Sequence, residues 1–293
     1  MSNKFKAVVL MLISALSFAF MGAMVKLAGD LPVIEKVFFR NMISLIVAFI
    51  LIKKAGVPLF GLRKNQKYLL LRSLLGLGGV ILYFIAISRL SLADSSMLNK
   101  LSPFFVTIFA WFFLKEKLLK LHIPILIIVF LASLLIIKPK FDLSVIPALS
   151  GFLSAIAAGA AYTTVRFLGN KEKPATIVFY FSFVSVVGLL PFLIFKFQMP
   201  SMNQWFYLLG TGLFAASGQM SLTYAYKLAP AVDIAVYNYT NVIFAAVIGY
   251  LIFNETSDLW STIGIMIILS TSVFIYFYQR RIRVRMENME SSL

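Results

Sequence analysis

The chain has 293 residues, of which 61% are hydrophobic and only 13% are charged, and its mean hydropathy is +0.93. A soluble domain cannot hide that much apolar surface from water, so the composition excludes a soluble globular protein and predicts a multi-span membrane protein. The net charge of +16 then reflects basic residues that flank the spans and attract anionic lipid headgroups. It gives no support to nucleic-acid binding.

Apolar runs long enough to cross a hydrocarbon core of about 30 Å follow one another along the chain. The predicted spans are 7–28, 33–52, 67–88, 93–114, 123–138, 148–168, 175–195, 203–226, 232–253 and 258–278. The first span follows Lys4 and Lys6 but has no small-residue cleavage site, so we interpret it as a retained helix rather than a signal peptide. The fold class is therefore an all-α integral membrane protein with ten transmembrane helices.

Basic residues predict the orientation, because lysine and arginine are retained on the cytoplasmic side. With the N-terminus inside, cytoplasmic segments hold the basic groups at 53–67, 115–120, 171–173 and 280–285. The outward loops hold only Lys36, Arg89, Lys138, Lys140 and Lys196. We expect a multi-pass protein of the inner (cytoplasmic) membrane with both termini in the cytoplasm, either monomeric or dimeric.

Residue types that carry catalysis or hold metals are scarce. The chain has no cysteine, which excludes disulfides and thiolate metal sites. Its single histidine, His122, begins the fifth run and is interpreted as an interfacial residue. No HExxH, GxSxG, Walker-type or GxGxxG motif occurs. The sequence argues against an enzyme and predicts no cofactor.

An internal repeat appears when the sequence is shifted by 139 residues. The shift places Tyr68 to Leu70 on Tyr207 to Leu209, and also superposes single residues. These pairs are Gly79 with Gly218, Ala86 with Ala225, Asp94 with Asp233, Asn99 with Asn238, Phe105 with Phe244 and Glu116 with Glu255. We predict two five-helix repeats, 1–140 and 141–293, the second with a short basic tail. Because five crossings are an odd number, the second repeat is inverted, which is an architecture suited to alternating access.

Three segments carry a family resemblance: VFFRN at 37–41, LSPFFVTIFAWFFLKE at 101–116 and YTNVIFAAVIGYLIFNE at 239–255. Together with the five-plus-five pattern, they resemble the EamA-type carriers of the drug/metabolite transporter superfamily. The resemblance covers nearly the whole chain. It implies a basket of helices around a central cavity, with the fourth and ninth helices among those lining it, no ATP hydrolysis, and a small-molecule metabolite as the partner.

Polar residues inside the spans mark the candidate substrate path, because they are costly in lipid and normally face water or one another. The fourth span carries Ser96, Asn99 and Lys100, and the ninth carries Asn238 and Asn241. Pro103 lacks the N–H that would bond the Asn99 carbonyl, so we expect a kink beside Lys100. Two alternatives stay open: the amides bond across helix contacts, or Lys100 snorkels to the interface.

Further candidates lie on other spans. Arg40 lies about 10 Å into the second span and either binds cargo or pairs with Asp30 or Glu35. Tyrosines inside spans or beside the polar patches are candidate surfaces for stacking on a flat cargo. They are Tyr83, Tyr162, Tyr224 and Tyr237. Lys26, Arg72 and Arg166 are interpreted as boundary residues, and Glu255 as architectural.

These residues predict a secondary transporter. Every acid lies at or near a predicted helix end, whereas Lys100 and Arg40 are deep, so we expect a cargo with a carboxylate or other anionic group. Facilitated or exchange-driven transport fits this pattern better than proton coupling. The alternatives are an exporter of amino acids or toxic organics with a preference for cations or zwitterions, and a membrane interaction protein that transports nothing.

Overall fold

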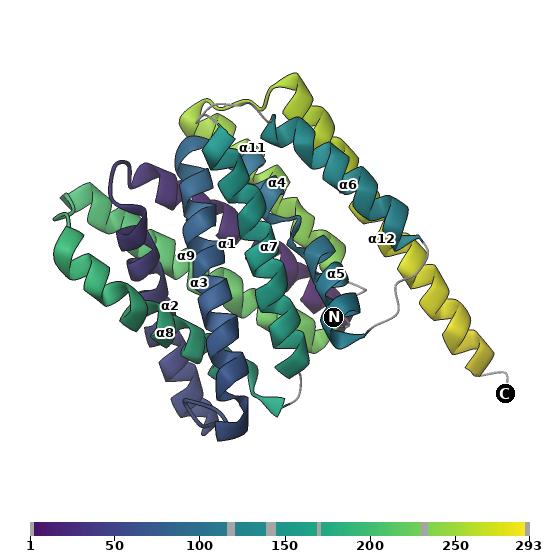
Figure 1. Ribbon diagram of the computed structural model, residues 1–293, viewed down its shortest axis with the longest axis horizontal. Coiled ribbons are helices and arrows are strands. Elements are labelled where there is room, and N and C mark those ends of the chain that lie inside the picture. Colours follow the sequence, from purple (N-terminus) through teal and green to yellow (C-terminus); the bar gives the residue numbers. More distant parts are fainter. Residues whose placement is uncertain (1–2, 116–120, 139–144, 169–170, 230–233, 291–293) are drawn as a thin grey trace.

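The computed structural model describes residues 3–115, 121–138, 145–168, 171–229 and 234–290, and the secondary structure of this part of the chain is helical (Figure 1). The elements of the first repeat are α1 (Asn3–Leu27), α2 (Val33–Ala55), η1 (Arg63–Asn65), α3 (Gln66–Arg89), α4 (Leu92–Asn99), α5 (Ser102–Leu114) and α6 (His122–Ile137). Those of the second are α7 (Ile146–Leu168), α8 (Pro174–Lys196), α9 (Met202–Leu228), η4 (Ala235–Tyr239), α11 (Thr240–Phe253) and α12 (Leu259–Glu290). When α4 is joined with α5 and η4 with α11, these helices coincide with the ten predicted spans.

The packing of the helices repeats itself between the two halves. α1 packs along α9, and the equivalent helices α7 and α3 pack along each other. In the same way α2 contacts α9, and α8 contacts α3. α1 also packs against α11, and the equivalent α7 packs against α5, whereas the contacts of α2 with α8 and of α6 with α12 join equivalent helices directly. This pattern relates two inverted five-helix repeats by a pseudo-two-fold axis, as the sequence predicted.

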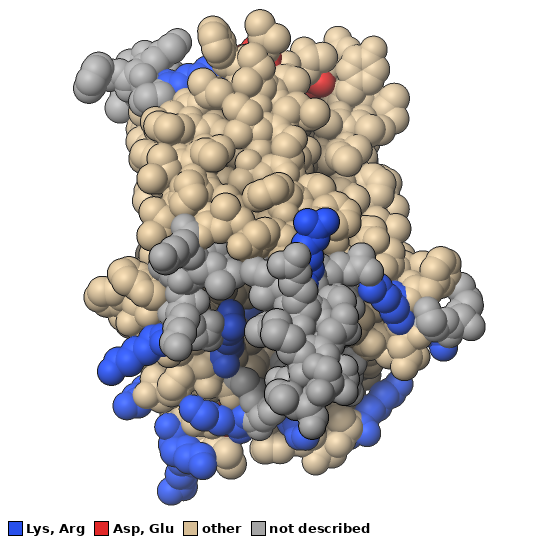
Figure 2. Space-filling model, turned by 90° about the vertical axis from the view of Figure 1, so that its right-hand side faces the viewer, with Lys and Arg blue, Asp and Glu red and all other residues tan. Residues whose placement is uncertain are grey.

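The two ends of the bundle differ in charge. Lysines and arginines gather at the lower end in Figure 2, which we call the basic end. Here Glu172 accepts hydrogen bonds from the Leu62 N–H at 2.8 Å and from Asn65 Nδ2 at 2.7 Å, joining the α2–α3 and α7–α8 connections. At the opposite end, which we call the far end, Lys26 forms an ion pair with Glu255, and Lys138 forms one with Asp258. The far end is thus held by charge pairs between helices distant in sequence.

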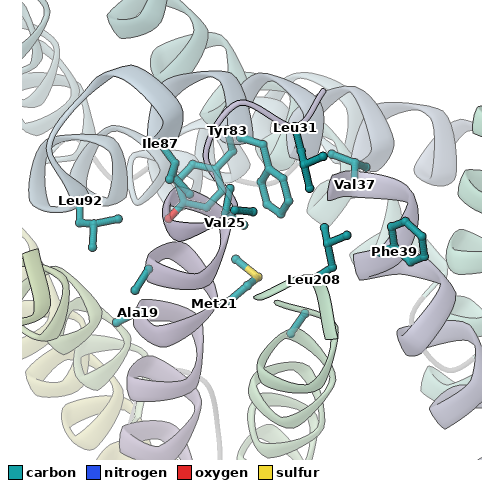
Figure 3. Close-up of a cluster of buried hydrophobic side chains, with 14 of the residues drawn as sticks. Ala19, Met21, Val25, Leu31, Val37, Phe39, Tyr83, Ile87, Leu92 and Leu208 are labelled. Atoms are coloured by element: carbon teal, nitrogen blue, oxygen red, sulfur yellow. The ribbon is translucent and has the colours of Figure 1, made fainter. Parts of the chain in front are cut away.

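Small residues allow the helices to approach closely. A Cβ added to Gly79 of α3 would lie 3.4 Å from the Cβ of Ala157 in α7, and one added to Gly218 of α9 would lie 3.2 Å from the Phe18 ring in α1. Gly79 and Gly218 are equivalent residues of the two repeats. Next to these contacts lies the largest apolar cluster, in which Figure 3 shows Tyr83 among aliphatic side chains. Gly79 and Gly218 therefore serve close helix packing.

The fourth and ninth spans both depart from regular α-helix at equivalent places, the fourth by a turn and the ninth by a change from 3-10 to α-helix. In the first repeat α4 ends at Asn99 and α5 begins at Ser102, with Lys100 and Leu101 in a turn. In the second repeat the 3-10 helix η4 ends at Tyr239, the residue equivalent to Lys100, and α11 begins at Thr240. The break beside Pro103 was predicted. The second break was not, because no proline lies within 235–253 to signal it.

A candidate substrate site between the two broken helices

Lys100 joins the two interrupted helices. Its Nζ atom donates a hydrogen bond to Asn238 Oδ1 at 3.0 Å, and the ammonium lies 5.8 Å from the centre of the Phe18 ring in α1. The turn that follows Asn99 places the lysine at the C-terminal end of α4, where it points across the bundle to η4. The structure therefore brings together Lys100 and Asn238, the pair that the sequence predicted for one site.

The other amides contact neighbouring helices. Asn99 Nδ2 donates to Ser154 Oγ of α7 at 3.1 Å, and the buried Asn241 donates from Nδ2 to the Ala15 carbonyl of α1 at 2.9 Å. Asn99 and Asn238, which the repeat makes equivalent, bond different partners rather than each other. Successive helical residues point about 100° apart, so Asn99 and Lys100 face different neighbours. The alternative interpretation of these amides, as bonds across helix contacts, describes this structure.

Ser96 and Tyr83 lie together one turn from Lys100. The Tyr83 hydroxyl and Ser96 Oγ are 3.3 Å apart, and both residues are buried. This pair links α3 to α4 and supports the residues that precede the break. Ser96, a predicted residue of the substrate path, thus has its hydrogen-bond partner within the protein.

The other predicted tyrosines are more accessible. Tyr162 of α7 and Tyr224 of α9 have 45% and 47% of their surface exposed. Tyr224 lines a cleft of about 370 Å³ between α1, α2 and α9, together with Ser217 and Ser221. Tyr237 packs against the apolar cluster of Ala7 and Met11 near the start of α1. Tyr162 and Tyr224 remain candidates for cargo contact, whereas Tyr237 has a packing role.

Arg40 lies away from the Lys100–Asn238 pair. It is 8% exposed, its Nη1 donates to Asn41 Oδ1 at 2.7 Å, and its guanidinium carbon lies 5.6 Å from the centre of the Phe181 ring in α8. Glu35, the acid considered as its partner, instead accepts the Gln198 N–H at 3.2 Å. Arg40 is therefore not held by the predicted ion pair.

Two residues interpreted as boundary residues have other surroundings. Arg72 is 8% exposed and lies over the same Phe181 ring as Arg40. Lys26 forms its ion pair with Glu255 and also donates to the Leu90 carbonyl at 2.7 Å. Glu255 in turn accepts the Leu92 N–H at 2.9 Å, which caps α4 and bears out its architectural interpretation. Sequence depth alone did not reveal which of these charges are buried.

The Lys100 ammonium has the chemistry to bind an anion. An ammonium group carries three N–H donors, and Asn238 accounts for one of them. Carboxylates are strong acceptors for such donors, especially where water is scarce. In the described part of the chain, each carboxylate lies in a connection or within a terminal turn of a helix, so Lys100 has no acid nearby along the spans.

A model of the EamA-like transporter family matches the sequence twice, over residues 5–138 and 145–277. The chain belongs to this family. The EamA-like chain is 34% identical to the pseudopaline exporter CntI of Pseudomonas aeruginosa over 89% of its own length and 93% of that protein. It is 27% identical to an uncharacterized transporter of Helicobacter pylori over 91% and 93% of the two chains, and 26% identical to human solute carrier family 35 member G1 over 89% and 76%.

A solved protein crystal structure shares the fold of this EamA-like chain. The TM-score is 0.69 over 94% of this chain and 98% of the other, with 14% sequence identity. At that identity the likeness concerns the fold alone. The family and its relatives establish a multi-pass membrane transporter of the drug/metabolite transporter superfamily, as the sequence segments indicated, and not an enzyme.

Proposed function

We propose that this protein is a secondary carrier that moves a small organic metabolite bearing a carboxylate across the cytoplasmic membrane by alternating access. The observation that carries the proposal is the Lys100 ammonium at the junction of the two broken helices, 3.0 Å from Asn238 Oδ1. Each repeat contributes one of these two residues. A cargo held there contacts both repeats, so their relative movement would change its access.

The distribution of charge supports an anionic cargo and argues against a dedicated proton site. The described carboxylates lie in connections and terminal turns, whereas Lys100 lies within a span. Among the described residues, no carboxylate lies midway along a span where it could be loaded with a proton or a sodium ion. We therefore infer facilitated or exchange-driven transport rather than transport coupled to protons.

The orientation of the protein in the membrane and the direction of transport rest on two further observations. The basic end contains the α2–α3 and α7–α8 connections, and the positive-inside tendency assigns it, with both termini, to the cytoplasm. The Pseudomonas relative is named an exporter, so we assign export to this chain as well.

The far-end contacts supply a gate for alternating access. Lys26, Glu255 and the backbone of Leu90 and Leu92 connect α1, the α3–α4 connection and the α11–α12 connection at that end. We infer that these contacts close the far end while the cargo enters from the basic end. Glu116, the repeat equivalent of Glu255, lies outside the described residues.

The test begins with a thermal-shift screen of the purified protein against amino acids, carboxylates, nucleosides and vitamins. Each carboxylate is paired with its neutral amide, so that a shift depending on charge is separated from one depending on shape. Flux of the hits is then measured in proteoliposomes for the wild type, Lys100→Met and Lys100→Arg. We expect Lys100→Met to lose carboxylate flux and Lys100→Arg, which keeps the charge, to retain part of it.

Other outcomes would contradict the proposal. Equal shifts with acids and amides, or hits confined to cationic compounds, would favour the alternative of a cation or zwitterion exporter. Stabilisation without any flux, or the absence of any hit, would favour a membrane interaction protein. Unchanged carboxylate flux in Lys100→Met would remove Lys100 from the site.

A further inference from the structure

Two arginines from neighbouring helices lie over one aromatic ring. The guanidinium carbons of Arg40 in α2 and Arg72 in α3 lie 5.6 and 4.1 Å from the centre of the Phe181 ring in α8. Both arginines are 8% exposed. Stacking on an aromatic face stabilises a guanidinium, but it leaves the N–H groups at the rim of the group unbonded.

These N–H groups are poorly satisfied. Arg40 Nη1 donates to Asn41 Oδ1, whereas Arg40 Nε and both Arg72 Nε and Nη1 are buried without a hydrogen-bond partner among the described residues. Burying a charged group without a partner costs several kcal/mol, and two like charges in one site repel each other. A site that keeps two such groups is completed by a ligand of opposite charge.

Arg72 and two aromatic residues lie at a similar depth in the bundle. Arg72, Phe181 and Tyr162 each lie six or seven residues from the basic end of their helices, a depth of about 10 Å. Tyr162 is half-exposed at this depth. A Cβ at Gly76 would lie 3.0 Å from both Arg72 Nη1 and the Phe181 ring, so glycine makes room for the stacked arginine.

The arginine pair is a second cluster of positive charge, separate from Lys100. Along α7, Tyr162 lies eight residues from Ser154, the partner of Asn99, which corresponds to about 12 Å. Arg72 therefore lies nearer the basic end than Lys100 does, whereas Arg40 lies seven residues from the far-end start of α2, at a depth similar to that of Lys100. Lys100, Arg40 and Arg72 are buried or half-buried and form no ion pair with an acid among the described residues. Three such cations match a cargo with several negative charges.

We propose that Arg40 and Arg72 bind a carboxylate group of the cargo where it enters from the basic end, and that the cargo is a polycarboxylate. The planar fork of a guanidinium matches the two oxygens of a carboxylate, and two forks at one ring would grip one carboxylate from two sides. The inference rests on the proposed function for the identity of the ligand as cargo. The existence of the anion site itself depends only on the arginine pair.

The test measures binding of tricarballylate, a tricarboxylate, to the purified full chain in detergent by thermal shift at constant ionic strength, with acetate and chloride as controls. We compare Arg40→Gln, Arg72→Gln and Arg72→Lys with Arg89→Gln. Arg89 is an exposed arginine at the other end of the same helix, α3, and serves as the matched control.

We expect tricarballylate to stabilise the wild type more than acetate or chloride does. Either glutamine variant should weaken tricarballylate binding by about tenfold to a hundredfold, the loss of a charge-assisted hydrogen-bonded contact. Arg72→Lys, which keeps the charge but not the fork, should fall between. Arg89→Gln should bind as the wild type does. Without ligand, the glutamine variants should be at least as stable as the wild type, because an unpartnered buried charge has been removed.

The proposal is overturned if tricarballylate and acetate stabilise the wild type equally or not at all, or if the glutamine variants keep wild-type binding. Short-chain phosphatidylglycerol is titrated in parallel. A shift that depends on Arg40 and Arg72 with this lipid but not with tricarballylate would make the pair a headgroup site instead. If tricarballylate binds at the arginine pair but no carboxylate flux is found in proteoliposomes, the site stands and the proposed transport fails. If flux depends on Lys100 but not on the arginines, only this inference fails.

Discussion

The two broken helices occupy equivalent places in the repeats but differ in chemistry. In the first repeat the break is a turn at Lys100 and Leu101 followed by Pro103. In the second it is a 3-10 helix ending at Tyr239, with no proline among residues 235–253. The interruption is thus a property of the repeat architecture, and proline accompanies only one copy of it. The charge is likewise present in only one copy, so under the proposed function the symmetric residues form the site and the unmatched Lys100 selects the charge of the cargo.

The largest expected effect comes from removing this asymmetry. Lys100→Tyr gives the first break the residue of the second and deletes the ammonium that contacts Asn238. We expect carboxylate flux in proteoliposomes to fall by about a hundredfold, the loss of a charge-assisted contact in a dry site.

The double variant Lys100→Tyr with Tyr239→Lys moves the charge to the other repeat and serves as the companion measurement. It should recover part of the flux, because the lysine then lies at the equivalent position across the pseudo-two-fold axis. Wild-type flux in Lys100→Tyr alone would show that the asymmetry has no role in transport.

The next effect concerns the packing beside the first break. A Cβ at Gly159 of α7 would lie 2.5 Å from the Cβ of Phe105 in α5. Both atoms are fixed to their backbones, so α5 would have to move, and we expect Gly159→Ala to destabilise the protein by about 1–3 kcal/mol. The measurement is the apparent Tm of the purified variant. Gly78→Ala is the control, since nothing lies within 4 Å of its added Cβ, and it should be neutral or stabilising. Equal Tm values for the two variants would show that α5 is loosely held.

The far end gives a smaller effect. Glu255→Gln keeps the shape of the side chain but removes the ion pair with Lys26 and weakens the bond from the Leu92 N–H. Because both side chains are partly buried, at 19% exposure each, we expect a loss of about 1–2 kcal/mol in stability. A cysteine introduced at position 96 in place of Ser96 reports whether the pair also closes this end. If it does, a membrane-impermeant maleimide added from the far end should label this cysteine faster in Glu255→Gln than in the parent protein. A fall in Tm without any change in labelling would leave Glu255 a purely structural role.

The smallest effect is expected at the proline itself. Pro103→Ala restores an N–H that can bond the Asn99 carbonyl. Because the second break exists without a proline, the first should persist. We expect the stability, followed through the apparent Tm, to change by at most about 1 kcal/mol. Retained carboxylate flux would agree with this result. A loss of flux comparable to that of Lys100→Tyr would mean that proline maintains the geometry around Lys100.

Much of the architecture was predictable because a bilayer imposes strict local rules. Each span must be apolar and about 20 residues long, so the predicted ranges 67–88 and 175–195 agree with α3 at 66–89 and α8 at 174–196. The shift of 139 residues likewise predicted that Gly79 and Gly218 would have equivalent roles, and both lie at close helix contacts. The same shift made Asn99 equivalent to Asn238, but the contact between Lys100 and Asn238 came from the tertiary structure.

The tertiary structure alone decided which polar groups meet. Sequence places a residue at a depth in the membrane, but the neighbour that a side chain contacts depends on the rotation of its helix and on which helices adjoin it. Asn99 therefore contacts Ser154 rather than Asn238, and Arg72, interpreted as a boundary residue, is buried beside Arg40 on the Phe181 ring. The sequence by itself determined the membrane fold, the repeat and the one unmatched lysine. The long-range packing of α2, α3 and α8 decided that two distant arginines share a site, because only folding brings their helices together.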